Sequence, residues 1–221
     1  MPVRDSEAIV LRTYPLGDAD RIVSLLTREH GRLRGVAKGA RKPKSAFGAA
    51  LEPLTYLKVW FYEKETLDLV RLRQCELIES FLDIQQDFRA GMALSLAAEI
   101  TEAVVPEREP QDPPFRLLLH VARGLRQPST RPFSLAYFLV WTLRLSGWFP
   151  DLDAKPGPRT PAVPPKHAAV ARVLLTGTLE KIAAGANSPG ITPDFEAYFL
   201  DMIERQADKR LQARRLYEET R

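Results

Sequence analysis

The sequence predicts an α+β protein with an N-terminal five-stranded β-barrel of the OB-fold type, residues 1–80, and an all-α domain, residues 81–221. Two observations support this division. From residue 7 to residue 78, apolar and polar residues alternate with a period of two, which is typical of strands. Beyond residue 80 the apolar residues recur with the spacing of amphipathic helices.

Five strands are expected in the first part, at residues 8–14, 21–27, 31–38, 54–62 and 67–78. Turns at 15–18 and 63–66 interrupt the alternation. A longer interruption separates the third strand from the fourth, and this layout is that of an OB-fold barrel. Asp18 and Asp20 could be read as a catalytic carboxylate pair, but their place between two strands favours a role in forming the turn.

Helices are expected at residues 83–88, 89–105, 115–126, 133–148, 167–184 and 194–219. The nearly apolar segment 133–148 should lie at the centre of the helical domain. Residues 150–165 contain six prolines and predict an irregular, proline-rich loop. The last helix ends in four cations that should complement its dipole, with contact to DNA as the alternative: Lys209, Arg210, Arg214 and Arg215. No Gly- or Ser-rich linker separates the two domains, so we expect them to share an interface near residues 80–89.

Basic residues gather in segment 31–45, although the net charge of the whole chain is only +4. They are Arg32, Arg34, Lys38, Arg41, Lys42 and Lys44, and no acidic residue lies among them. In an extended strand the first three point to one side while Leu33, Gly35 and Ala37 point to the other. A basic strand that leads into a basic loop predicts a surface for a polyanion, and the competing interpretation is an ordinary solvated face.

The last two strands add aromatic and basic residues to the outside of the barrel. In the fourth strand Tyr56, Lys58, Trp60 and Tyr62 share a side, and in the fifth Arg71 and Arg73 do so. Aromatic rings beside cations are how OB-folds stack bases and hold phosphates of single strands. Alternatively, the aromatic residues pack the barrel against the helical domain.

Composition excludes several classes of protein. The chain has one cysteine, Cys75, and its three histidines are far apart, so no disulfide, metal site or cofactor is expected. We find no phosphate-binding Gly-rich loop and no Ser, His and acid pattern, which argues against an enzyme. The N-terminus lacks the apolar core of a signal peptide and no segment approaches about 20 apolar residues, which predicts a cytoplasmic protein without membrane contact.

Three stretches together resemble the RecO family of bacterial DNA repair proteins: residues 7–13, the acidic pair at 18 and 20, and residues 27–45. The order of barrel and helices extends the resemblance over the whole chain. It implies a non-enzymatic recombination mediator that binds single- and double-stranded DNA, anneals complementary strands and helps to load the recombinase. It also implies two partners, RecR and the acidic C-terminal tail of the single-strand-binding protein, and a place at the bacterial nucleoid during repair. The DNA surface of the family maps to Arg32, Arg34, Lys38 and the loop 41–44.

The chain departs from the family at one point. Many members follow the stretch at 147–153 with two Cys pairs that bind structural zinc, whereas residues 154–166 here contain no cysteine. The resemblance therefore implies that this zinc is absent. Two other functions stay open, an RNA-binding OB-fold module and a scaffold whose basic surface recruits acidic proteins.

Overall fold

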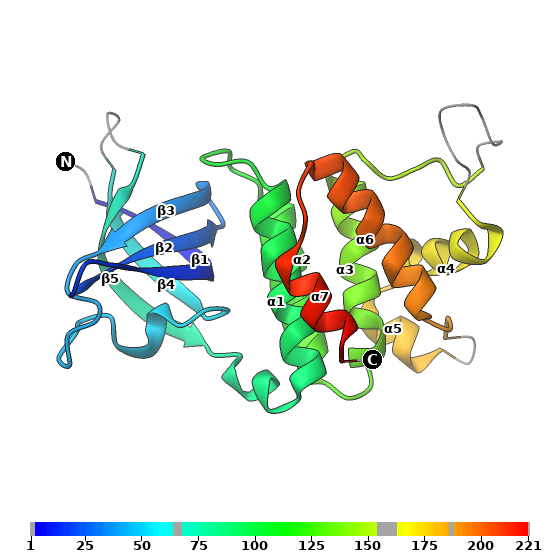
Figure 1. Ribbon diagram of the computed structural model, residues 1–221, viewed down its shortest axis with the longest axis horizontal. Helices are drawn as coiled ribbons and strands as arrows, with labels where there is room; N and C mark the ends of the chain where they lie inside the picture. Colours follow the sequence, from blue (N-terminus) through cyan, green and yellow to red (C-terminus); the bar gives the residue numbers. More distant parts are fainter. Residues whose placement is uncertain (1–2, 64–67, 154–162, 186–187, 221) are drawn as a thin grey trace.

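The computed structural model describes residues 3–63, 68–153, 163–185 and 188–220. A β-barrel built from the N-terminal strands lies beside a group of helices (Figure 1). This arrangement confirms the predicted fold class. No helix in the described ranges is long and apolar enough to cross a membrane.

The barrel is a closed sheet with the strand order β1-β2-β3-β5-β4. The strands are β1 (Val3–Leu16), β2 (Asp20–Thr27), β3 (Gly31–Ala37), β4 (Tyr56–Tyr62) and β5 (Val70–Glu79). Among the described strands, β3 and β5 pair in parallel, the other pairs are antiparallel, and β4 pairs with β1 to close the sheet. Five strands in this order confirm the predicted OB-fold barrel.

The first strand is longer than the predicted segment 8–14. Residues 3–9 pair with β4, and residues 8–16 pair with β2. One strand serves two neighbours because a bulge between Val10 and Arg12 bends it across the barrel. The first turn therefore starts later than predicted. Of the second predicted turn, residues 64–66 lie outside the described residues.

Inward-pointing side chains from all five strands fill the barrel, and each is at most 9% exposed. They are Ala8, Val10, Val23, Leu25, Leu33, Ala37, Leu57, Val59, Phe61, Val70, Leu72 and Cys75. The loop after β3 contains the 3-10 helix η1 (Gly48–Leu51), and its Phe47 and Leu51 pack into the same core. This part of the loop is therefore anchored to the barrel.

The helical part begins directly after the barrel. Its elements are the 3-10 helix η2 (Leu82–Gln86) and the helices α1 (Phe88–Val104), α2 (Asp112–Arg126), α3 (Arg131–Leu145), α4 (Pro165–Thr176), α5 (Leu179–Ala184), α6 (Pro193–Ala207) and α7 (Gln212–Glu218). As predicted for 133–148, α3 lies in the middle, in contact with α1, α2, α4, α5 and α6. Of the predicted proline-rich loop, residues 154–162 lie outside the described residues.

Three helix predictions need correction. Instead of a helix over 83–88, the structure has the short η2, which ends at Gln86. Asp87 then caps α1 by accepting a hydrogen bond from the Ala90 amide at 3.0 Å. The segment 167–184 breaks at Gly177, where a Cβ would lie 2.8 Å from the Ile182 side chain. The segment 194–219 breaks at Asp208, whose left-handed φ of 47° ends α6.

The basic end of the last predicted helix is consequently divided. Lys209 and Arg210 lie in the connection between α6 and α7, and Arg214 lies in α7. The Arg214 guanidinium pairs with Glu204 at 2.8 Å and with Asp201 at 2.7 Å, both on α6. The predicted single helix is therefore wrong, and Arg214 joins two helices instead of complementing the dipole of one. Arg215 does lie in the last turn of a helix, α7, as a dipole-complementing cation would.

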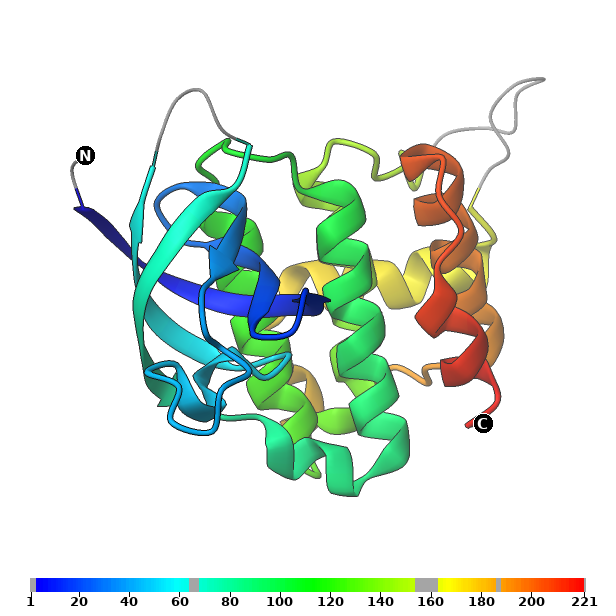
Figure 2. The same ribbon diagram turned by 60° about the vertical axis from the view of Figure 1, so that its left-hand side comes forward.

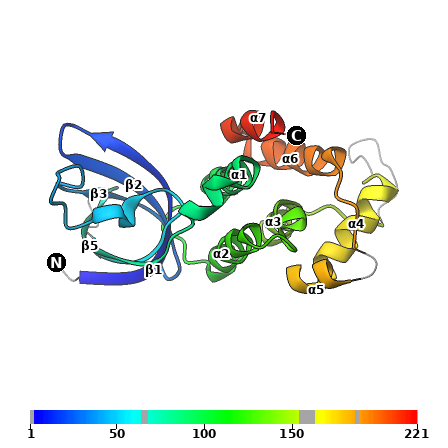
Figure 3. The same ribbon diagram turned by 90° about the horizontal axis from the view of Figure 1, so that it is seen from below.

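Two helices, α1 and α2, form the layer that faces the barrel, and the other helices lie behind them (Figures 2 and 3). Outward-facing residues of the barrel join the core of the helical part, namely Ile9, Leu11, Leu26, Leu54 and Tyr56. Phe81, between β5 and η2, belongs to the same core. One continuous apolar core thus spans the boundary, as expected for domains without a flexible linker.

Candidate nucleic-acid interface

The third strand has the two-sided character that the sequence predicts. Leu33, Gly35 and Ala37 point into the barrel, whereas Arg34 and Lys38 are exposed. A Cβ at Gly35 would lie 2.8 Å from the Leu72 side chain on the neighbouring strand, so glycine lets this side chain pack directly against β3. The close approach of β3 and β5 brings the basic residues of both strands onto one outer surface.

Strand β5 continues this surface. Val36 of β3 is the register partner of Arg71, and because the pairing is parallel, Lys38 and Arg73 follow in the same direction. Arg71 and Arg73 are both exposed. We call the four exposed cations Arg34, Lys38, Arg71 and Arg73 the basic face.

The basic loop, residues 39–45, extends from the end of the basic face, and its Arg41, Lys42 and Lys44 are exposed. The loop is held by the first turn of the barrel. The Gly39 amide donates to Asp20 Oδ1 at 2.8 Å, and the Arg41 amide donates to the Ala19 carbonyl at 2.9 Å. Asp20 therefore holds the turn and the basic loop together. This agrees with the turn-forming role that the sequence favoured over a catalytic one.

Most of these cations lack an acidic neighbour. Within the described residues, no carboxylate lies within ion-pair distance of Lys38, Arg41, Lys42, Lys44, Arg71 or Arg73. Elsewhere on the molecule arginines are mostly paired, for example Arg28 with Asp112 and Arg126 with Glu79. The barrel surface therefore keeps a positive charge that its own acids do not neutralise.

Arg32 differs from its neighbours. Its side chain is only 15% exposed, Nη1 lies 2.9 Å from Glu107 Oε1, and Nε donates to the Val105 carbonyl at 3.0 Å. Both partners belong to the connection between α1 and α2. Arg32 was predicted to bind DNA, but in this structure it joins the barrel to the helical part.

The aromatic residues of β4 divide between two roles. Tyr56 is buried and meets Phe115 of α2 edge to face, with ring centroids 6.0 Å apart. Burial raises the pKa of the Tyr56 hydroxyl, which therefore stays protonated. Trp60 and Tyr62 stay partly exposed, and Lys58 Nζ lies 5.2 Å from the centroid of the Trp60 ring. Tyr56 thus packs at the domain interface, whereas Trp60 remains partly exposed, and its stacking on bases stays a prediction.

Sequence reasoning missed Arg108, which lies in the connection between α1 and α2. Its amide donates to the Arg32 carbonyl at 3.0 Å, and its guanidinium donates to the Asp68 carbonyl at 3.0 Å. The alternation of charges in residues 106–110, with proline at both ends, was the available signal. No strand or helix period identifies such a segment.

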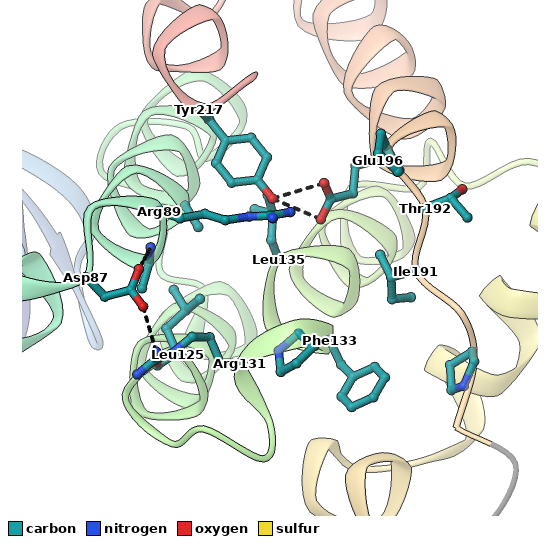
Figure 4. Close-up of a pocket in the computed structure, with 15 residues that line it drawn as sticks. Asp87, Arg89, Leu125, Arg131, Phe133, Leu135, Ile191, Thr192, Glu196 and Tyr217 are labelled. Atoms are coloured by element: carbon teal, nitrogen blue, oxygen red, sulfur yellow. Dashed lines mark hydrogen bonds and ion pairs between the residues drawn. The ribbon is translucent and has the colours of Figure 1, made fainter. Parts of the chain in front are cut away.

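A pocket in the helical part was also not predicted. It has a volume of about 410 Å³ and lies between α1, α3, α6 and α7 (Figure 4). Apolar side chains such as Leu125, Phe133 and Ile191 line it together with Arg89 and Arg131. Arg131 pairs with Asp87 at 2.7 Å, and the buried Glu196 accepts a hydrogen bond from Tyr217. Burial raises the pKa of Tyr217 to about 12.

Metal-binding groups are not clustered in the described part of the chain. No three His, Cys, Asp or Glu side chains there are placed to hold one ion. Cys75 is buried in the barrel core, and burial raises the pKa of its thiol to about 12. The candidate site is therefore a surface of cations and partly exposed rings on the outside of the barrel.

Comparison with known proteins identifies similar sequences for both parts. The family model described as "Recombination protein O N terminal" matches residues 1–81, and "Recombination protein O C terminal" matches residues 85–167. The chain is 43% identical over 150 residues to the DNA repair protein RecO of Koribacter versatilis, covering 68% of this chain and 61% of that protein. It is 39% identical over 158 residues to the DNA repair protein RecO of Cutibacterium acnes, covering 69% and 64%. The matched region thus spans less than two thirds of these relatives.

Proposed function

The chain belongs to the RecO family of DNA repair proteins, and on this premise we propose that it binds single- and double-stranded DNA through the basic face and the basic loop. It would act without catalysis as a recombination mediator, annealing complementary strands and helping to load the recombinase onto DNA coated by single-strand-binding protein, together with RecR. Such a protein works in the bacterial cytoplasm, at the nucleoid.

One observation carries the proposal, namely that six neighbouring cations on the barrel have no acidic partner within the described residues. A phosphate backbone that binds to unpaired cations releases its condensed counterions, which supplies most of the affinity of sequence-independent binding. Cations held in ion pairs would first have to give up their partners.

The same surface suits annealing. Contacts to phosphates position a strand without reading its bases, so the base edges stay free to pair with a second strand. Trp60 and Tyr62 beside the basic face add rings on which bases can stack, a contact worth about 1–3 kcal/mol per base. Neutralised phosphates also repel a second strand less.

Salt titration of DNA binding tests the proposal. Replacing Arg41, Lys42 and Lys44 by Ala removes three phosphate contacts. The fall of log affinity with log salt should then become less steep, by about 2 units of slope for single strands and about 2.7 for duplex. The matched control replaces three exposed cations of the helical part, Lys166, Arg172 and Arg215, each of which has a carboxylate partner. We expect the control to keep nearly the full slope.

A folded triple variant with unchanged affinity and slope would refute the role of the loop. Competition with single-stranded RNA of the same sequence addresses the alternative function, because an RNA-binding module would prefer the RNA. Strand annealing, measured with and without single-strand-binding protein, then addresses the mediator role directly.

The pocket of the helical part is our candidate for the acidic tail of the single-strand-binding protein. Its apolar walls suit the side chains of a peptide end, and Arg89 and Arg131 can pair with carboxylates, although Asp87 already holds Arg131. Replacing Ile191 by Glu should abolish binding of a labelled tail peptide, whereas Val173→Glu on the exposed side of α4 should not. Equal binding by both variants would move the docking site elsewhere.

A further inference from the structure

The connection between α1 and α2 crosses the barrel at the edge of the basic face. Glu107 forms a parallel bridge with Arg32 of β3, and the Arg108 amide donates to the Arg32 carbonyl. The backbones approach so closely that a Cβ on Gly31 would lie 2.2 Å from the Glu109 carbonyl oxygen. Backbone contacts therefore hold this connection against β3.

The side chain of Glu107 adds a different kind of contact. Its Oε1 lies 2.9 Å from Arg32 Nη1 and 3.2 Å from Arg34 Nε. One anionic oxygen thus bridges two guanidinium groups, which is also how a phosphate oxygen would be bound by this pair. The Glu107 side chain is 35% exposed and that of Arg34 is 45% exposed, so solvent reaches the pair.

We propose that Glu107 is an internal competitor for phosphate, whose carboxylate occupies the Arg32 and Arg34 end of the DNA-binding surface. The inference rests on the proposed function and deepens it. A DNA phosphate must displace this carboxylate before it can contact the Arg34 guanidinium. The protein therefore binds DNA more weakly, and releases it more readily, than it would without Glu107. Weak binding suits a protein that must leave the strand after handing it to a recombinase.

The ion pair is placed to exchange rather than to hold the domains together. Backbone hydrogen bonds and the Arg32 contact to the Val105 carbonyl remain when the carboxylate leaves. The pair of Glu107 with Arg34, whose side chains are 35% and 45% exposed, contributes little to stability because water screens it. A phosphate that replaces the carboxylate meets the same donors and releases a counterion in addition.

The test is the variant Glu107→Gln, which removes the charge and keeps the shape. It frees one cation for contact with phosphate. The fall of log affinity with log salt should therefore become steeper, by about 0.7 units of slope for single strands and about 0.9 for duplex. At 0.1 M salt one such contact corresponds to affinity about fivefold higher for single strands and about eightfold higher for duplex. Binding would be measured on the full chain by fluorescence anisotropy with mixed-sequence oligonucleotides.

The control is Asp153→Asn, which changes the net charge of the chain equally. Asp153 pairs with Arg172 of α4, and α4 lies at the end of the molecule far from the barrel (Figure 1). We expect it to leave affinity and slope unchanged. The double variant Glu107→Gln with Arg34→Ala should lose the gain, because the freed contact is then missing.

Three outcomes would overturn the proposal. Unchanged or weaker binding by Glu107→Gln, with an unaltered unfolding midpoint, would make Glu107 only a positioning group for Arg32. Equal gains in Glu107→Gln and Asp153→Asn would reflect net charge alone. A gain that survives Arg34→Ala would mean that a different contact was freed. If any of these outcomes were found while the Arg41, Lys42 and Lys44 variant lost DNA binding, the proposed DNA-binding function would stand without the role of Glu107. Wild-type protein without affinity for DNA would refute both the function and the role of Glu107.

Discussion

Replacing Gly31 by Ala should destabilise the protein far more than the same replacement at Gly17. Both glycines have left-handed backbone, with φ of 67° and 56°. At Gly17 an added Cβ meets no atom within 4 Å, whereas at Gly31 it would lie 2.2 Å from the Glu109 carbonyl oxygen and 2.7 Å from the Glu109 nitrogen. The pair of variants therefore separates backbone strain from close contact.

The expected magnitudes follow from these contacts. Left-handed backbone costs an Ala residue about 1–2 kcal/mol, which is the whole effect expected at Gly17. At Gly31 the connection must also move, because it meets the new Cβ with backbone atoms that no rotamer change can withdraw. The Arg108 amide then loses the Arg32 carbonyl and Arg32 loses the Val105 carbonyl, at about 1 kcal/mol each. The total loss at Gly31 is therefore about 3–4 kcal/mol.

Urea unfolding followed by circular dichroism measures both losses. The two variants should show similar slopes of free energy against urea and clearly different midpoints. If Gly31→Ala and Gly17→Ala lost equal stability, the connection between α1 and α2 would not lie against β3 as described. The argument for Glu107 as a competitor would then lose its structural basis.

The remaining predictions concern the interface, the thiol and the metal. Tyr56→Ala should cost about 3–4 kcal/mol in urea unfolding because it leaves a cavity against Phe115, whereas Tyr56→Phe should cost about 1 kcal/mol; equal costs would contradict ring packing. Cys75 should react with a thiol reagent at pH 8 only after unfolding, and rapid reaction of native protein would contradict its burial. Since the thiol pKa is about 12 when folded and about 8.5 when unfolded, the contribution of Cys75 to stability should fall as pH rises from about 9 towards 12. Cys75→Ala should remove the part of the fall that begins near pH 9, whereas the part above about pH 10 that comes from the raised pKa of Tyr56 and Tyr217 should remain. Metal analysis of purified protein should find no stoichiometric zinc, and one zinc per chain would refute that prediction.

The barrel could be predicted because strand period and burial are local properties of the sequence. Alternation in residues 31–38 fixes which side chains enter the core, and a shift by one residue would bury cations. The exposure of Lys38 and Arg71 followed from the same alternation, whereas the basic loop was predicted from the Gly and Pro residues that interrupt it. Helix positions were predicted for the same reason, apart from the segment 83–88 and the breaks at Gly177 and Asp208. A single residue that ends a helix hardly changes the apolar pattern on either side of it.

What the sequence by itself determined is thus the inside and the outside of each strand and the presence of a basic, partly aromatic exterior. Only the tertiary structure decided how that exterior is used. Tyr56 and Trp60 point to the same side of β4, yet α2 covers the first and leaves the second accessible. Arg32 and Lys38 likewise share one side of β3, but residues 105–107 engage only the first. The period of a strand distinguishes two faces, whereas the partner of the outer face comes from a segment about 60 to 75 residues later whose position depends on packing of the whole chain.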